Sequence, residues 1–373
     1  MQNNKLLFVI SHQPNPRFIK QINYFVQNGF DVSVIYFYRN YLADLNDNID
    51  KKVNLYCLDT IENGKYMQRI GIYLKSVFTL KKLLKKINPN KIIITNIDIL
   101  FLLIFNNIKK YTNDIVMEIS DLRGYTFNTR FIDKLQQNLD SIVLKKYVSK
   151  MIFTSPKFYE FYYKNKFKKE YFILENKPLK NMLPPKIEKV KSKKIIIGIV
   201  GLLLDGKPHK SLFEYVKDKT DIEVHIYGKG IFEAQAKEYA QKYNNIKYFG
   251  PYNFFKDISK IYASLDIIYM SYDTTQCDEN IKLALPNKLY EAIYYRVPII
   301  TTSETYLAQR VLEYGIGYTI KCCNHSDIKK AIYECIKNRD RLLYNFDELC
   351  DDLYLANKDY EKLFEFIKRN GNI

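Results

Sequence analysis

The chain has 373 residues, of which 47% are hydrophobic and 27% charged, a composition that excludes a disordered or fibrous protein and suits two globular domains of about 180 residues each. The formal net charge is +17, and residues 1–190 hold +15 of it against +2 in residues 191–373. The chain has no apolar run near the roughly 20 residues of a membrane span, no leader pattern and no C-x-x-C pair, so we expect a cytoplasmic protein with reduced thiols.

The first half alternates short apolar runs with amphipathic segments. Residues 16–28 predict a helix, with Asn15 as its N-cap and Gly29 just past its end. Apolar runs rich in β-branched residues predict strands over residues 5–10, 31–37, 53–58, 91–95, 115–119, 151–154 and 171–175.

The second half shows the same alternation. Its apolar runs predict strands over residues 194–200, 222–227, 246–249, 266–270, 297–301 and 317–320. Because continuous apolar strands that alternate with helices form parallel sheets covered on both faces, we predict two doubly wound α/β domains in tandem. Ligands of such sheets bind at the carboxyl ends of the strands, so we expect the site in a cleft between two facing domains.

A linker is predicted over residues 178–194, where Pro184-Pro185 is followed by a run of lysines. The charge balance changes at the same place. We therefore expect a basic N-terminal domain over residues 1–190, a C-terminal domain over residues 191–352 and a terminal helical segment over residues 353–373.

The motifs of several enzyme classes are absent from the sequence. It contains no P-loop, no G-x-G-x-x-G, no G-x-S-x-G and no H-E-x-x-H. With four histidines and no D-x-D pair, we also expect no bound metal ion and no cofactor.

Three strand ends in the second half carry candidate phosphate ligands. Gly201 ends one strand, and Lys207 lies six residues further on. A glycine allows the main chain to approach a phosphate, and a lysine neutralises its charge. Gly228 ends the next strand, and Tyr252 follows the third, so both are candidate donor-binding residues; plain turn geometry is the alternative for the glycines.

The segment Leu285-Pro-Asn-Lys-Leu-Tyr-Glu-Ala292 precedes the strand predicted over residues 297–301. Pro286 suits the first turn of a helix, whose free N–H groups and dipole favour a diphosphate, so we expect Pro286, Asn287 and Lys288 to face one. Glu291 lies about one turn further, where a carboxylate can bridge two ribose hydroxyls. The alternatives are ordinary capping and a glutamate on the helix surface.

This ordered set resembles the C-terminal donor domain of GT-B glycosyltransferases, particularly glycosyltransferase family 4 and its capsule or O-antigen relatives. The resemblance is good over residues 194–320 and looser in the first half. It implies two Rossmann-like domains that face each other across a cleft, and a C-terminal helix that crosses back to the first domain. Leu202 replaces the arginine usual in the family, and Leu283 replaces the first glutamate of its E-x7-E pair.

The resemblance implies a sugar transfer from a UDP- or GDP-linked donor to a glycan or an undecaprenyl-diphosphate-linked acceptor in bacterial capsule or O-antigen synthesis. It also implies retention of configuration, without a metal ion. Lys207 and Lys288 are expected to stabilise the leaving diphosphate, and Glu291 to hold the ribose. We count Lys207 and Glu291 as catalytic.

In the first half, the segment from Arg17 to Lys20 resembles the first helix of these enzymes, and Met117-Glu-Ile-Ser-Asp121 resembles their acidic motif at a strand end. Asp121 is therefore expected to act in catalysis or to orient the acceptor. His12, Arg17 and Lys20 are expected on the acceptor side, and generic surface charge is the alternative for Arg17 and Lys20.

Two basic segments, residues 66–87 and 157–169, combine lysines with apolar and aromatic residues, a pattern typical of proteins at an anionic bilayer surface. We therefore expect peripheral attachment to the inner face of the cytoplasmic membrane. The alternative is that the apolar stripes face the sheet and the lysines face water.

Three other functions remain open. The first is a nucleotide-sugar epimerase on the same fold. The second is a catalytically lapsed GT-B protein that binds a membrane or a partner enzyme, which the missing glutamate at Leu283 motivates. The third is a nucleic-acid binder, which only the charge favours; the balanced second half argues against it, and we expect no nucleic-acid partner.

Overall fold

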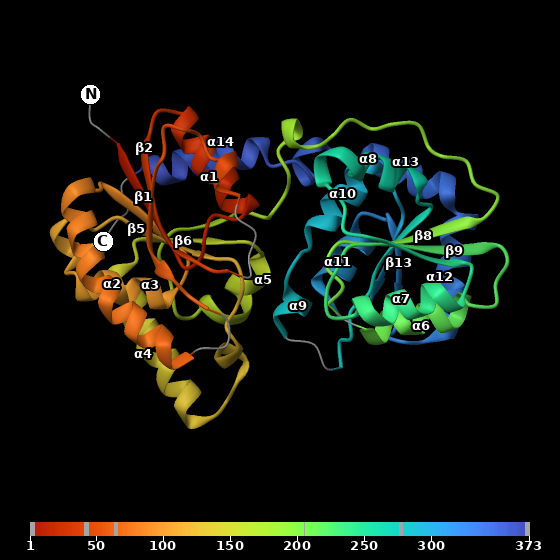
Figure 1. Ribbon diagram of the computed structural model, residues 1–373, viewed down its shortest axis with the longest axis horizontal. Helices are drawn as coiled ribbons and strands as arrows, with labels where there is room; N and C mark the ends of the chain where they lie inside the picture. The colour runs from red at the N-terminus through yellow and green to blue at the C-terminus, as the bar shows by residue number, and fades with distance from the viewer. Residues whose placement is uncertain (1–3, 41–44, 63–65, 205, 276–278, 370–373) are drawn as a thin grey trace. The chain divides into compact units, whose positions relative to one another are not determined.

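The computed structural model describes residues 4–40, 45–62, 66–204, 206–275 and 279–369, with the main chain alone for residues 66–70 (Figure 1). The chain divides into two compact units: unit 1 is residues 1–175 with 359–373, and unit 2 is residues 176–358. The boundary expected after residue 190 lies inside unit 2, because the segment before it packs on helix α8 (Phe254–Ser264). There the Val190 N–H donates to the Ala263 carbonyl at 2.9 Å.

Unit 1 contains a parallel sheet of seven strands in the order β3-β2-β1-β4-β5-β6-β7. Each predicted strand is present, and its ends agree with the prediction within two residues. The strands are β1 (Lys5–Ile10), β2 (Asp31–Tyr38), β3 (Asn54–Thr60), β4 (Lys91–Ile94), β5 (Ile115–Ile119), β6 (Lys150–Phe153) and β7 (Tyr171–Ile173).

Helices cover both faces of this sheet. Figure 1 shows α1 and α14 on one face and α2, α3 and α4 on the other. The predicted helix at residue 16 is confirmed, with the Asn15 side chain accepting from the Phe18 N–H and Gly29 at φ +90° past the end. The helices are α1 (Pro16–Gln27), α2 (Tyr66–Ile87), α3 (Ile97–Phe105), α4 (Phe131–Tyr147), the short α5 (Pro156–Phe158), which continues as a π-helix over Tyr159–Tyr163, and α14 (Asn357–Lys368).

A buried lysine fixes the end of α14 to the sheet of unit 1. The Lys150 ammonium, at the start of β6, donates to the Phe366 carbonyl at 2.6 Å and to the Arg369 carbonyl at 2.5 Å. The last carbonyls of a helix have no partner inside the helix and carry its negative partial charge, so a lysine satisfies both needs. This contact joins the C-terminal residues to unit 1.

The two segments that predicted a membrane contact turn many of their apolar side chains inward. On α2, the Tyr73 ring stacks on Phe37 of β2 at 4.9 Å, and Leu80, Leu84 and Ile87 are buried. In residues 157–169, four aromatic side chains are buried: Phe158, Tyr162, Tyr163 and Phe167. For these side chains the alternative is correct: they are buried inside unit 1, because the apolar side of a helix that covers a sheet packs inward.

Unit 2 contains a parallel sheet of six strands in the order β10-β9-β8-β11-β12-β13. All six predicted strands are present. They are β8 (Ile195–Val200), β9 (Ile222–Tyr227), β10 (Ile246–Gly250), β11 (Ile267–Met270), β12 (Ile299–Thr302) and β13 (Gly317–Ile320).

Two apolar cores sandwich this second sheet. Ile197 and Ile199 of β8 join a core with α6, α7 and α12, whereas Ile196 and Val200 join another with α8, α10 and α11. Successive side chains of a strand point to opposite faces, so a strand covered on both sides reads as a continuous apolar run. The helices are α6 (Gly206–Val216), α7 (Glu233–Lys242), α8, α9 (Glu279–Leu283), α10 (Asn287–Tyr295), α11 (Tyr306–Glu313), α12 (His325–Lys337) and α13 (Arg339–Glu348).

Candidate functional site

The loops after β8 and β9 meet at the carboxyl edge of the unit 2 sheet through two glycines. Gly201 has φ +97° and Gly228 has φ +132°, a region that favours glycine. A Cβ atom on Gly228 would lie 1.8 Å from the Gly201 carbonyl oxygen. Glycine at 228 is therefore required by the close approach of the two loops, and a ligand contact by Gly201 or Gly228 remains a prediction.

Lys207 lies in the first turn of α6 and pairs with a carboxylate that the sequence patterns did not reveal. Its ammonium is 3.2 Å from the Asp273 carboxylate. The hydrogen bond with Asp273 raises the pKa of Lys207, and hydrogen bonds from Thr275, followed in strength by Lys207, lower the pKa of the buried Asp273 carboxyl. More than half of the Lys207 side chain stays exposed, so the cation is accessible from solvent.

Asp273 is the third residue after β11, and β11 is next to β8 in the sheet. Parallel strands place their carboxyl ends along one edge, so a polar residue just after β11 lies near the loop after β8. This strand-end position was the signal that could have identified Asp273 in the sequence.

The N-terminus of α10 reaches the same edge of the sheet. Pro286, predicted in the first turn of a helix, is the N-cap residue directly before it, and Asn287 and Lys288 begin the first turn. A Cβ atom on Gly201 would lie 3.6 Å from the Lys288 side chain, so the two residues are adjacent. Burial lowers the pKa of the Lys288 ammonium.

A pocket in unit 2 opens beside Lys288. The rest of its lining comes from the ends of β8 and β11 and from α6: Leu202, Leu204, His209, Tyr269, Met270, Ser271 and Tyr272. The Asn287 side chain is held partly by another residue: its amide oxygen accepts a hydrogen bond from the Asn176 side chain at 2.6 Å. Lys288 is thus the residue of this segment that the structure brings to the pocket.

Glu291, in the second turn of α10, is only 8% exposed. The surface glutamate considered as its alternative is therefore wrong. The Tyr262 hydroxyl of α8 donates to its carboxylate at 3.0 Å, while burial raises the pKa of Glu291. Burial raises the pKa of the Tyr252 hydroxyl, and the charge of the nearby Glu291 raises it further. The structure thus groups Tyr252, Tyr262 and Glu291, and the ribose contact remains a prediction.

Four predicted site residues belong to unit 1, and two of them are buried. Arg17 of α1 donates to Glu118 of β5 at 2.6 Å and to the Leu174 carbonyl at 3.1 Å. Lys20, one turn further, is also buried, and burial lowers its pKa to about 7. Generic surface charge is therefore wrong for both residues, because neither guanidinium nor ammonium group faces open water.

The acidic motif of β5 contributes a structural carboxylate and an exposed one. Glu118 is fully buried and accepts from Arg17 and, at 2.7 Å, from the Gln21 side chain. Asp121 is exposed beyond the end of β5. His12, just after β1, is half-buried, its ring Nδ1 donates to the Gln13 carbonyl at 2.7 Å, and burial lowers its pKa. An acceptor role remains a prediction for His12, Arg17, Lys20 and Asp121.

Within the described ranges, no three His, Cys, Asp or Glu side chains are grouped closely enough to hold a metal ion. A helix both long and apolar enough to cross a bilayer is likewise missing from the part of the chain that the structure describes.

Comparisons with known proteins agree with this arrangement. Residues 184–352 match the family described as "Glycosyl transferases group 1". No curated protein matches the sequence. Sucrose-phosphate synthase from Thermosynechococcus elongatus has a TM-score of 0.73 and 11% identity, with 98% of each chain covered.

Two further solved structures have a similar fold. HepE from Anabaena, in complex with UDP, has a TM-score of 0.68 and 13% identity over 98% of this chain and 99% of its own. WaaG, a glycosyltransferase of lipopolysaccharide biosynthesis, has a TM-score of 0.67 and 14% identity over 97% of this chain and 99% of its own. These likenesses confirm the predicted fold class, two Rossmann-like α/β domains of the GT-B type.

Proposed function

We propose that this chain, a GT-B glycosyltransferase of group 1 that takes its sugar from a nucleotide donor, transfers it to a glycan or an undecaprenyl-diphosphate-linked acceptor in bacterial surface polysaccharide synthesis. The donor in this proposal is UDP- or GDP-linked. The observation that carries the proposal is the meeting of Lys207, Lys288 and the N-terminus of α10 at the carboxyl edge of one parallel sheet.

The charges at this edge of the sheet support a binding site for the donor diphosphate there. A nucleoside diphosphate carries its negative charge on two adjacent phosphates, and the free N–H groups at the start of α10 favour such an anion. Lys207 and Lys288 add two ammonium groups, which stabilise the charge that develops on the leaving diphosphate. Because these groups supply the positive charge themselves, we propose a reaction without a metal ion.

The remaining residues position the two substrates. Glu291 holds the ribose hydroxyls, and Tyr252 lies beside it. Asp121, exposed after β5, orients the acceptor hydroxyl, and the resemblance to family 4 supports retention of configuration as an analogy. The HepE structure is a complex with UDP, which supports a uridine nucleotide for this chain.

The acceptor side is proposed to work at a membrane surface. Unit 1 has 30 lysines and arginines against 18 aspartates and glutamates, a net charge of +12. A cation of this size favours anionic lipids and lipid-linked diphosphates. The role of WaaG in lipopolysaccharide biosynthesis supports a similar class of product. We therefore place the protein on the inner face of the cytoplasmic membrane.

The proposal is tested by titration calorimetry of the full chain with UDP, GDP, CMP and dTDP, in the presence of a chelator. We expect one nucleotide to bind tightly, and Glu291→Ala to weaken it at least tenfold. Glu238→Ala, which removes an exposed carboxylate from α7, is the matched control and should bind as the wild type does. Failure of all four nucleotides to bind would refute the donor site.

Product analysis then separates the remaining functions. Incubation with the matching nucleotide-sugar and a lipid-linked acceptor should lengthen the acceptor. An isomerised nucleotide-sugar would instead indicate an epimerase, and binding without turnover on any acceptor would indicate a lapsed enzyme.

A further inference from the structure

Helix α4 of unit 1 (Phe131–Tyr147) exposes an unusual number of large apolar side chains. The exposed fractions are 76% for Phe131, 75% for Ile132, 53% for Leu135, 49% for Leu139 and 63% for Ile142. A helix at the surface of a soluble protein normally turns polar side chains to solvent. A contiguous apolar stripe of this kind marks a surface that contacts something else.

The stripe is not the side of α4 that packs on the sheet. At 100° per residue, the five exposed side chains fall within an arc of about 100°. Val143 and Leu144 are buried, together with Asp140, on a side of the helix whose centre lies about 120° from the centre of the stripe. One side of α4 therefore completes the core, and the other is free to contact a partner.

Lysines lie next to the exposed stripe. Lys134 and Lys145 are exposed along one flank, and Lys146 is exposed in line with the stripe at its C-terminal end. An apolar stripe beside lysines is the composition of a helix that lies in the headgroup region of an anionic bilayer.

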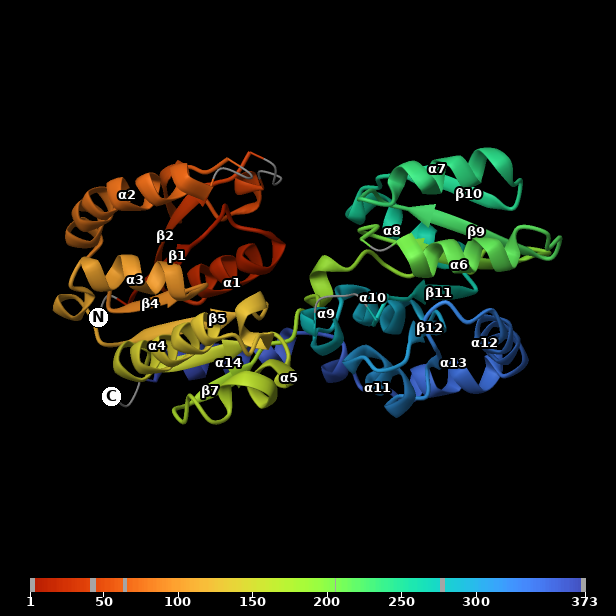
Figure 2. The same cartoon turned by 90° about the horizontal axis from the view of Figure 1, so that it is seen from below.

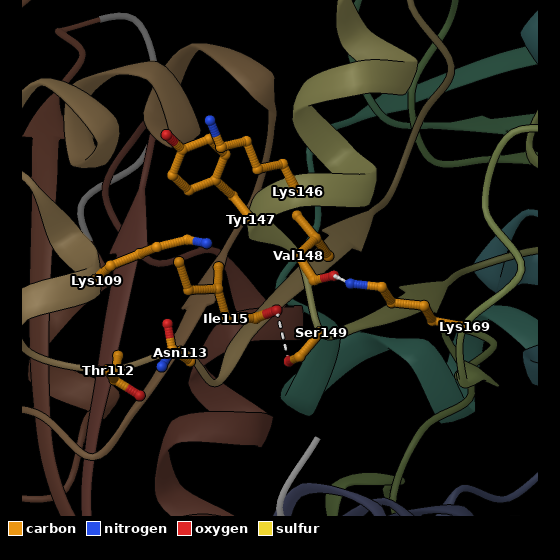
Figure 3. Close-up of a pocket in the computed structure, with 9 residues that line it drawn as sticks. All are labelled: Lys109, Thr112, Asn113, Ile115, Lys146, Tyr147, Val148, Ser149 and Lys169. Atoms are coloured by element: carbon orange, nitrogen blue, oxygen red, sulfur yellow. Dashed lines mark hydrogen bonds between the residues drawn. The ribbon is translucent and has the colours of Figure 1, made fainter. Parts of the chain in front are cut away.

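A basic pocket continues the cationic surface at the end of α4 (Figure 3). The ammonium groups of Lys109 and Lys146 lie 5.1 Å and 5.5 Å from the ring centre of Tyr147. Lys169 donates to the Lys145 and Val148 carbonyls, so its charge is bound to the helix end and not to a carboxylate. Burial, followed by the nearby charge of Lys109, lowers the pKa of Lys169.

Helices α2 and α3 cover the same face of the sheet as α4 (Figures 1 and 2). Leu74 and Phe78 of α2 and Phe105 of α3 are also largely exposed. Helix α2 adds five exposed lysines: Lys75, Lys81, Lys82, Lys85 and Lys86. The apolar stripe thus belongs to a strongly basic face of unit 1.

We propose that α4 is the element that docks this protein on an anionic phospholipid surface, with the stripe from Phe131 to Ile142 inserted among the headgroups and Lys134, Lys145 and Lys146 against the lipid phosphates. Charge complementarity selects this occupant. A second copy of the chain packed on the same stripe would bring two basic faces together, and like charges oppose that contact. The inference rests on the membrane part of the proposed function and is independent of the sugar transfer.

The first test measures binding of the full chain to vesicles by co-sedimentation. Vesicles of phosphatidylcholine are compared with vesicles that also contain phosphatidylglycerol, at low and at high salt. We expect binding only to the anionic vesicles, weakened by salt. The stripe variant Ile132→Ser/Leu135→Ser/Ile142→Ser should lose at least tenfold in partition coefficient.

A matched control removes the same number of exposed apolar side chains from unit 2. The control variant is Ile231→Ser/Phe255→Ser/Leu312→Ser, and it should bind vesicles as the wild type does. Thermal unfolding and nucleotide binding of both variants verify that they are folded. Unchanged vesicle binding by the stripe variant would overturn the role of α4 and leave the membrane proposal standing. No vesicle binding by the wild type would overturn both, whatever the nucleotide titrations show.

A second test uses the absence of tryptophan from the sequence. Leu139→Trp introduces a single indole on the stripe, and its emission should shift to the blue and be quenched by brominated lipid when anionic vesicles are added. Leu312→Trp, on an exposed position of unit 2, should show neither change. If light scattering shows a dimer that the stripe variant abolishes while vesicles shift neither indole, the stripe is a protein interface and the proposal is wrong.

Discussion

The Lys207 ammonium lies 3.2 Å from the Asp273 carboxylate, although 66 residues separate the two in the chain. The pair joins the start of α6 to the end of β11 at the edge of the unit 2 sheet where we place the donor diphosphate. A carboxylate next to a phosphate site holds the lysine in place but opposes an incoming anion. In the proposed donor site, Lys207 is therefore expected to be shared between Asp273 and the diphosphate.

Removing either member of this pair should have opposite effects on nucleotide affinity. Lys207→Ala is expected to weaken UDP binding about tenfold or more, as loss of a charged hydrogen bond does. Asp273→Asn is expected to bind UDP at least as tightly as the wild type, because a negative charge is removed. Calorimetric titration measures both, with Lys210→Ala, an exposed lysine one turn along α6, as the control. Weaker binding by Asp273→Asn would mean that Asp273 chiefly positions Lys207.

We expect the buried Glu291 carboxylate to lower the stability of the folded protein and to contribute to nucleotide binding. Burial raises its pKa, so the ionised form is disfavoured in the folded protein, and this cost grows as pH rises above the usual range of a glutamate. Glu291→Gln is expected to unfold at a higher temperature than the wild type at pH 8, with the difference vanishing near pH 4, and to bind the nucleotide more weakly. Calorimetric scans across this pH range measure it. A lower unfolding temperature at pH 8 would contradict the prediction.

Gly228 should be intolerant of any side chain. A methyl group there would meet the Gly201 carbonyl at 1.8 Å, and φ at residue 228 is +132°. Gly228→Ala is therefore expected to destabilise unit 2 by about 2 kcal/mol or more and to abolish nucleotide binding. Gly71→Ala is a control, because nothing lies within 4 Å of its added Cβ in α2, and it should stabilise by about 0.5–1 kcal/mol. Equal stability of the two variants in urea would refute the argument.

Lys20 should make the stability of unit 1 depend on pH in the alkaline range. Its pKa is lowered from 10.5 to about 7 by burial and then by Arg17, while Glu118 acts in the opposite direction. The unfolded chain thus binds the proton more tightly, so stability rises as pH increases from about 7 to 10.5.

Lys20→Met should remove this dependence and stabilise the protein by a few kcal/mol, on the order of what a shift of this size implies, at pH 7 and below. The gain should disappear toward pH 10.5. Urea unfolding at several pH values measures the effect, and Lys81→Met, on an exposed position of α2, is the control. A constant difference between Lys20→Met and the wild type at every pH would show that packing, and not ionisation, is responsible.

The fold followed from the sequence because its strands are defined by local patterns. The strands Lys5–Ile10, Ile115–Ile119, Ile222–Tyr227 and Gly317–Ile320 begin and end at the predicted residues. Each is a short segment rich in apolar residues. Ile222–Tyr227 also contains Glu223 and His225, and this alternation of apolar and polar residues predicts a strand as well. The glycines at strand ends and the start of α10 likewise lie in short segments, so the resemblance to GT-B glycosyltransferases could be drawn from the sequence.

The tertiary structure decided which side chains meet and which faces are covered. Asp273 reaches Lys207 only because β11 is the neighbour of β8 in the sheet, and Arg17 is buried only because Glu118 lies beneath α1. Periodicity shows that a helix has an apolar stripe, but it does not show what packs on that stripe. Leu80, Leu84 and Ile87 of α2 are therefore buried, while the apolar stripe of α4, which the sequence did not distinguish, remains exposed.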